Sequence, residues 1–447
     1  MIYSALNQSV GGRGSISKEG RKLKGLHSIF RLASHNTSIR TEFLAGLTTF
    51  FTISYIIIVN SSIISETGIP FEAALLGTIF TSCLSCLLMG LWANAPIIIV
   101  PGMGVNAFFT FTMVHEMGLS WQEALTAVTL SGMLFTIITF TPLATWLSSA
   151  VPTALKKGMT VGIGLLITFI GLQKGGLIIS NEQTFVSFGN LHQPKVWITL
   201  FSLALLIILF VRKVQGAFLI TLVLATVVAL IADPSIAQGE PAPLSLEQYV
   251  PLLGNFALAG LGKLTFWVAT FTLTMILVFE NMGLLQGLLT DKQKFPAAFQ
   301  ASALSNIMAG LLGTSATICA LESATGTQSG GRTGLTTITA GGLFLLSLIL
   351  IPYLKWIPES AVAAIMIVVG GLMMQEVQAI PFGDFTEGLP AFITFAFIPF
   401  TYSIPTGIAF GFITYAILKI AAKRTREVPI SFFIIALLFM IQLGLHG

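Results

Sequence analysis

Long apolar segments, each bounded by Pro, Gly or a charged residue, recur along the whole chain. Segments of roughly 20 apolar residues are long enough for a helix to cross a hydrocarbon core of about 30 Å. These segments lack the strict alternation of membrane barrel strands, and in lipid only helices and closed barrels satisfy their own backbone. The pattern therefore predicts an all-α polytopic membrane protein.

The apolar segments form two sets of seven, separated by a longer polar loop. The first set lies near 43–63, 72–93, 98–114, 121–142, 157–177, 196–211 and 216–232. The second set lies near 264–286, 297–312, 315–329, 334–354, 360–375, 388–403 and 404–421. A shorter apolar segment, 430–445, is compatible with an interfacial helix or with a fifteenth span.

Composition supports a membrane location. Of the 447 residues, 54% are apolar and only 9% are charged, whereas soluble domains carry about 25% charged residues. The three cysteines all lie in apolar segments, and Cys83 and Cys86 form a C-x-x-C pair. Without a second pair or a nearby His, we interpret them as packing thiols, and we expect no metal site and no cofactor.

The basic residues give the orientation. With the N-terminus in the cytoplasm and fourteen crossings, 18 of the 22 Lys and Arg residues lie on the cytoplasmic side, as the positive-inside rule requires. The predicted organisation is a disordered cytoplasmic tail (1–40), a first repeat (41–232), an extracytoplasmic loop (233–262), a second repeat (263–421) and a basic cytoplasmic loop with a short apolar tail (422–447). An odd number of spans per half inverts the second half relative to the first, which is typical of transporters.

The third segment of each set is broken. Residues 96–109 contain a β-branched run between two prolines, which favours extended backbone, followed by Gly102 and a helix start near Asn106. Residues 313–326 are rich in Gly, Ser and Thr and too polar to face lipid. Paired breaks predict a substrate site near the bilayer midplane, where helix N-termini carry partial positive charge. The alternative is a pair of kinks that let helices pack closely.

Two carboxylates lie inside apolar segments, Glu280 and Glu322. A charge at the bilayer centre costs about 2.5–3.5 kcal/mol or more, so it normally faces a cavity and marks a substrate or proton path. Alternatively, each Glu only hydrogen-bonds neighbouring helices. Two acids and an amide suit a planar ring with several N–H donors, whereas an anionic substrate calls for Arg or Lys, and the spans carry neither near the breaks.

At these residues the chain resembles the nucleobase–cation symporter family, in particular its branch of purine permeases for adenine, guanine and hypoxanthine. The matching stretches are 40–51, 101–109, 162–165, 322–323, 331–334 and 399–404. The resemblance implies fourteen spans in a seven-plus-seven inverted fold with a core and a gate domain. It also implies short strands in spans three and ten, and proton-coupled uptake of a base across the cytoplasmic (inner) membrane.

The resemblance carries binding roles to Asn106 and Glu322, and it places Glu280 at the family's span-eight carboxylate. The purine branch usually has two aspartates three residues apart in span eight, where this chain has Leu277 and Glu280. A Glu followed three residues later by Gly283 is more similar to the uracil and xanthine branches. A uracil- or xanthine-type symporter is therefore the main alternative.

The predicted substrate site combines Glu280 and Glu322 as acceptors with Asn106, Ser323 and the backbone near Gly104 and Phe108. Phe108 or Phe109 is available for stacking, and Glu280, or else Glu322, is expected to exchange the driving proton.

An anion transporter of sulfate type, a passive channel and an intramembrane enzyme are the other classes; no His lies in mid-span, so we predict no enzyme. The sequence leaves open which base binds, whether Na⁺ replaces the proton, and whether two copies form a homodimer. No nucleic-acid partner is expected.

Overall fold

A computed structural model describes residues 29–141, 152–232, 246–354 and 356–446 of the chain. The protein is mostly helical. Within these ranges, nine helices are long and apolar enough to cross a membrane, and two shorter apolar helices accompany them. The prediction of an α-helical polytopic membrane protein is confirmed; the number of crossings and the inverted repeat stay predictions.

Every predicted segment overlaps a described element. The first set corresponds to α2 (Ile39–Ile53) with α3 (Ile56–Ile64), α4 (Phe71–Leu88), β1 (Ile99–Pro101) with α5 (Met103–Ala107) and the π-helical η3 (Phe108–Glu116), α6 (Trp121–Thr139), α8 (Thr153–Lys174), α9 (Pro194–Val211) and α10 (Ala217–Ala232). The second set corresponds to α11 (Leu264–Leu288), α12 (Phe295–Leu311), β4 (Thr317–Cys319) with α13 (Ser323–Gln328), α14 (Gly334–Leu346) with α15 (Ile351–Leu354), α16 (Glu359–Met373), α17 (Phe385–Thr401) and α18 (Ile404–Ala421).

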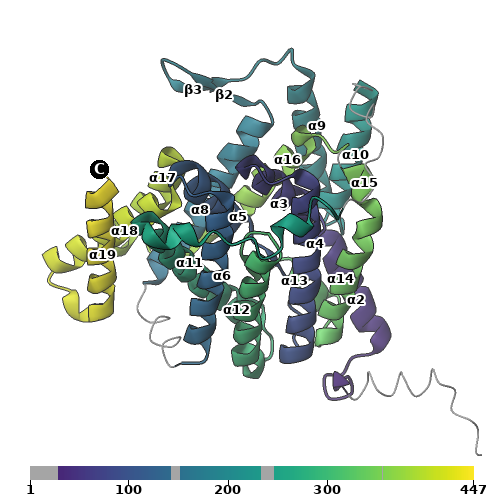
Figure 1. Ribbon diagram of the computed structural model, residues 1–447, viewed down its shortest axis with the longest axis horizontal. Coiled ribbons are helices and arrows are strands. Elements are labelled where there is room, and N and C mark those ends of the chain that lie inside the picture. The colour runs from purple at the N-terminus through teal and green to yellow at the C-terminus, as the bar shows by residue number, and fades with distance from the viewer. Residues whose placement is uncertain (1–28, 142–151, 233–245, 355, 447) are drawn as a thin grey trace, which may run out of the picture.

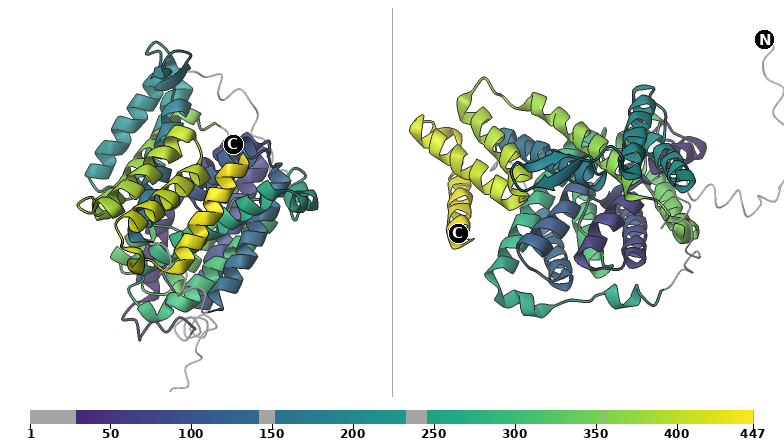
Figure 2. Two further views of the ribbon diagram at one scale, coloured as in Figure 1. Left: turned by 90° about the vertical axis from the view of Figure 1, so that its left-hand side faces the viewer. Right: turned by 90° about the horizontal axis from the view of Figure 1, so that it is seen from above.

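The helices pack as two groups. One group, here called the core group, contains α2, α3, α4, α6, α11, α12 and α14 around the broken segments; the gate group contains α8, α9, α10, α16, α17 and α18. Seen from above, α16 to α18 lie along one side of the molecule and α6, α11 and α12 along the other (Figure 2). Small residues allow the close approach inside each group: a Cβ at Gly132 of α6 would lie 2.5 Å from a backbone atom of α12, and one at Gly370 of α16 would lie 2.3 Å from the Gly164 carbonyl of α8.

The two broken segments meet as strands. β1 and β4 pair antiparallel, with Ile99 opposite Cys319 and Pro101 opposite Thr317. Each strand is followed by a short helix, α5 after β1 and α13 after β4. The short strands that the resemblance implied are therefore present, and they lie among the helices of the core group.

A β-hairpin lies between α8 and α9, where no element was predicted. β2 (Ile178–Asn181) and β3 (Phe185–Phe188) pair antiparallel and extend beyond the helices (Figure 1). The Asn181 side chain accepts hydrogen bonds from the backbone N–H groups of Gln183 and Thr184 and so closes the turn.

The ends and the long loop are better packed than predicted. Residues 1–28 of the predicted tail lie outside the described residues, whereas Phe30 and Leu32 are buried against Leu335 of α14; the division of the chain at residue 40 stays a prediction. In the loop, Tyr249 is buried and its hydroxyl donates to the Leu312 carbonyl at 3.0 Å. Segment 430–445 forms α19 (Ile430–His446), which packs on α18.

Candidate functional site

Side-chain amides hold the outer edge of β4. Asn306 of α12 accepts from the Thr317 N–H at 2.8 Å and donates to the Thr317 carbonyl at 3.0 Å. Asn281 of α11 accepts from the Cys319 N–H at 3.0 Å. A strand edge inside a membrane has no water to bond, so side chains must replace the missing neighbouring strand. The sequence analysis missed Asn306, because a single Asn in an apolar helix has no distinctive pattern.

Ser323 links the two broken segments. Its buried hydroxyl oxygen accepts a hydrogen bond from the Ile98 N–H at 2.9 Å, just before β1 begins. The Ala320 N–H donates to the Ile98 carbonyl at 2.9 Å and extends the contact. Ser323, which was predicted to bind substrate, is thus hydrogen-bonded to the Ile98 backbone in this state.

Asn106 lies in a buried amide and hydroxyl cluster. Its Oδ1 accepts a hydrogen bond from the Ser315 hydroxyl, whereas its Nδ2 is buried without a partner in the described part of the chain. Asn60 of α3 lies in the same cluster, and both N–H groups of its amide are paired: they donate to Thr78 at 2.7 Å and to Thr314 at 3.0 Å. A buried unpaired donor costs about 1–3 kcal/mol, so Asn106 offers a free N–H to a ligand.

Glu322 has a partner that the sequence did not suggest. The hydroxyl of Tyr55, at the junction of α2 and α3, donates to Oε1 of Glu322 at 2.7 Å. The Tyr55 ring is buried and lies 4.8 Å, centroid to centroid, from Phe218 of α10 in the gate group. Tyr55 therefore contacts a core carboxylate with its hydroxyl and a gate helix with its ring.

Glu280 lies beside the same strand. Its neighbour Asn281 holds Cys319 of β4, and Glu322 follows Cys319 by three residues. The side chain of Glu280 is half-buried, and its Oε2 atom is buried without a hydrogen-bond partner among the described residues. Both predicted carboxylates are thus placed next to β4.

Gly104 and Phe108 belong to the helix that follows β1. A Cβ at Gly104 would lie 2.7 Å from Cγ2 of Ile163, so this glycine brings α5 against α8 of the gate group. The Gly104 carbonyl accepts the Phe108 N–H inside the helix. Phe108 and Phe109 are fully buried.

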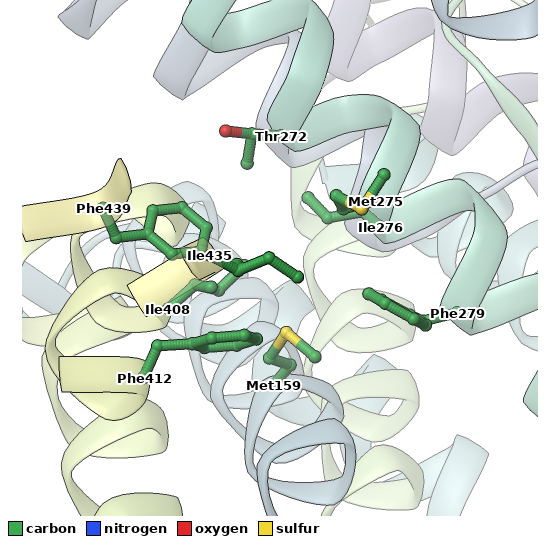
Figure 3. A pocket seen from close by; sticks show the side chains of 9 residues that line it. All are labelled: Met159, Thr272, Met275, Ile276, Phe279, Ile408, Phe412, Ile435 and Phe439. Carbon is green, nitrogen blue, oxygen red and sulfur yellow. The ribbon is translucent and has the colours of Figure 1, made fainter. Parts of the chain in front are cut away.

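A narrow apolar crevice lies between α11 and the helices α8, α18 and α19 (Figure 3). Its lining consists of Met159, Thr272, Met275, Ile276, Phe279, Ile408, Phe412, Ile435 and Phe439. Only the Thr272 hydroxyl is polar, so the crevice offers little to a polar ring. Beside it, Nζ of Lys156 lies 5.3 Å from the ring centroid of Phe279.

The site as described is acidic and rich in amides. Glu280 and Glu322 provide acceptors, and Asn106 provides a donor. Among the described residues, no group of three or more His, Cys, Asp or Glu side chains could hold a metal ion. The arrangement can bind a neutral polar molecule and exchange a proton at a carboxyl group.

Proteins of similar sequence are named as permeases and transporters. A family model described as "Permease family" (Xan_ur_permease) matches residues 40–410. Nucleobase transporter PlAzg2 of Paenibacillus larvae is 45% identical over 85% of this chain and 77% of its own length. Adenine permease AdeP of Escherichia coli is 35% identical over 94% of this chain and 96% of its own length. Guanine/hypoxanthine permease PbuO of Bacillus subtilis is 36% identical over 93% of this chain and 99% of its own length.

Solved structures share the fold at low identity. The transmembrane domain of the cyanobacterial bicarbonate transporter BicA superposes with a TM-score of 0.62 at 15% identity, covering 83% of this chain and 97% of that one. The murine anion transporter Slc26a9 in its inward-facing state gives 0.64 at 13% identity, covering 92% and 73%. These similarities concern the fold alone.

Proposed function

Because the chain belongs to the Permease family, we propose that it is a secondary active transporter that takes up a purine nucleobase together with a proton across the cytoplasmic membrane. Its relatives are permeases and transporters rather than enzymes, and two of those compared above are named for adenine and for guanine or hypoxanthine. The observation that carries the proposal is that two buried polar atoms near the strands, Nδ2 of Asn106 and Oε2 of Glu280, have no hydrogen-bond partner among the described residues. Unpaired buried polar groups call for a ligand that completes them.

A purine satisfies these groups. Its N–H groups, on the ring or on the exocyclic amino group, are donors for Glu280 and for the second oxygen of Glu322, and its ring nitrogens or carbonyl are acceptors for Asn106. Ser323 and the backbone near Gly104 and Phe108 border the same segment and complete the proposed site. The Tyr55 hydroxyl keeps one oxygen of Glu322 occupied and oriented.

The proton enters through a carboxyl group. Glu280 has an oxygen without a donor, so protonation or a substrate N–H stabilises it, and we assign the driving proton to this group. Glu322 already accepts from Tyr55 and is the secondary candidate. Binding of the proton then removes the charge of Glu280, one of the two carboxylate charges that oppose movement of the site across the bilayer.

Alternating access follows from the two helix groups. We assign fourteen spans in two inverted repeats, 41–232 and 263–421, with the N-terminus in the cytoplasm and the loop 233–262 outside. The core group carries the site, and it moves against the gate group at surfaces such as the Gly104–Ile163 contact.

Radiolabelled uptake in a strain that lacks base transporters tests the function. Unlabelled adenine, guanine or hypoxanthine should compete, and an uncoupler should abolish accumulation. Competition by uracil or xanthine instead would support the alternative suggested by Glu280 with Gly283. Competition by sulfate or bicarbonate would assign the chain to anion transport. A Glu322→Gln variant that reaches the membrane and takes up purines with normal affinity would contradict the site.

A further inference from the structure

An ion pair joins the two helix groups at one end of the bundle. Lys174, the last residue of α8 in the gate group, pairs with Glu66 in the single turn that follows α3 of the core group. The Lys174 side chain is only 11% exposed. Its Nζ also lies 3.7 Å from Oε1 of Glu359 at the start of α16, so two carboxylates hold this one ammonium group.

Aromatic side chains join the two groups at the same end. Tyr402, between α17 and α18, has a left-handed backbone (φ 59°), which turns its side chain toward α8 and η3. Its hydroxyl donates to Gln173 at 3.0 Å. Its ring lies 5.5 Å from Phe111 of η3 in the core group and 5.9 Å from Phe169 of α8, both edge to face.

These contacts differ from those that build each group. Ion pairs such as Lys195 with Glu359, 2.9 Å apart, link α9 to α16 inside the gate group and can persist throughout transport. The contacts of Lys174 with Glu66 and of Tyr402 with Phe111 must break whenever the two groups separate at this end. The aromatic contact favours the closed arrangement, and the ion pair specifies which residues meet when the two groups close.

We infer that the Glu66–Lys174 ion pair and the Tyr402–Phe111 contact form the outer gate, which closes the substrate path on the extracytoplasmic face in the state described here. The inference rests on the proposed function, because it takes the outer face from the proposed topology, in which α3, η3 and α8 all end outside. No residue of this gate belongs to the proposed substrate site.

A thiol cross-link tests the gate. Glu66→Cys with Lys174→Cys places one thiol on each group, and the three native cysteines are buried, so a membrane-impermeant bifunctional thiol reagent added to whole cells reaches the engineered pair first. Before cross-linking, the variant should keep part of its uptake, since the pair does not touch substrate. After cross-linking, uptake should stop, and a reductant should restore it.

The matched control is Glu123→Cys with Lys263→Cys, which joins α6 to the residue before α11 within the core group, touches no residue of the gate and should transport normally when cross-linked. Continued uptake by the cross-linked Glu66–Lys174 variant would overturn the inference. Cross-linking by a permeant reagent but not by the impermeant one would also overturn it, because the pair would then face the cytoplasm. Failure of the proposed function is distinct: the unmodified protein would then show no uptake of any base.

Discussion

The Tyr55 hydroxyl donates a hydrogen bond to Oε1 of Glu322 across 267 residues of sequence. The same ring packs on Phe218 of the gate helix α10. A carboxylate of the proposed site is thus oriented by a side chain that also contacts the opposite helix group. A movement of α10 relative to the core group can therefore change the hydrogen bond that Glu322 accepts from Tyr55.

Tyr55→Phe should weaken substrate binding. The substitution removes one donor to the carboxylate and keeps the ring against Phe218. A hydrogen bond to a charged group contributes about 1.5–3 kcal/mol, so the KM for uptake should rise about tenfold or more while the amount of protein in the membrane is unchanged. Tyr249→Phe is the control, because its hydroxyl donates to the Leu312 carbonyl, away from both carboxylates. Equal KM values for the two variants would contradict the role of Tyr55.

Asn106 and Asn60 should separate binding from stability. Asn106→Ala removes the unpaired Nδ2, and the Ser315 hydroxyl that loses Oδ1 of Asn106 still has Oδ1 of Asn60 as an acceptor at 3.3 Å, so thermal stability in detergent should change little while the KM for the base rises about tenfold. Asn60→Ala removes a fully paired amide and should lower stability by about 1–3 kcal/mol. Tryptophan fluorescence during heating measures thermal stability, and uptake assays measure the KM. A loss of stability in Asn106→Ala with an unchanged KM would place the ligand elsewhere.

Asn306→Ala should destabilise the strand pair. It leaves both the N–H and the carbonyl of Thr317 unpaired in the membrane interior, at a cost of about 1–3 kcal/mol for each group. We expect a large loss of thermal stability and of folded yield. Asn255→Ala, which removes an exposed bond to the Pro251 carbonyl, serves as the control. A normal melting temperature for Asn306→Ala would show that β4 does not depend on this amide.

Gly104→Ala should impair transport by crowding the surface between the two helix groups. The added methyl would lie 2.7 Å from Cγ2 of Ile163, well inside van der Waals contact. Uptake should fall severalfold. Adding Ile163→Ala removes Cγ2 and should restore part of the rate. A double variant no better than Gly104→Ala alone would locate the defect outside this contact.

Acid should weaken the connection between α17 and the turn before α19. The Arg424 guanidinium, which donates to Asp384 at 2.7 Å, and then the Thr386 hydroxyl and N–H lower the pKa of Asp384 from 3.8 to about 2. A lowered pKa in the folded state contributes stability above the unfolded value, and this contribution is lost as the pH falls through about 2.

Asp384→Asn should therefore melt at a lower temperature than the parent protein near neutral pH. The gap should shrink as the pH falls from about 4 toward 2, where the parent carboxyl group is itself protonated. Melting curves of the two purified proteins over this range measure it. A gap that stays constant across the range would mean that the charge of Asp384 contributes nothing.

The features that were predictable from sequence are those that break a local rule. Pro101 with Gly102 interrupts an apolar segment, and Glu280 and Glu322 place charge where lipid excludes it, so each was visible without knowledge of its neighbours. The structure then places these residues around one strand pair.

The features that were missed depend on partners far away in sequence. Asn60 and Thr314 are 254 residues apart, and a lone Asn or Tyr in an apolar helix has the same local appearance whether or not it meets a partner. The β2–β3 hairpin was missed for a different reason: its strands are four residues long, which is too short for alternation to be distinguished from a loop.

The pairing of β1 with β4 also constrains biogenesis. Ile99 finds its partner Cys319 only after the ribosome has synthesised more than two hundred further residues. Until then, the third segment has backbone N–H and C=O groups that find no hydrogen-bond partner in lipid. It must therefore wait in the insertion machinery, or among earlier helices, until the tenth segment emerges, so the two halves of the protein cannot mature separately.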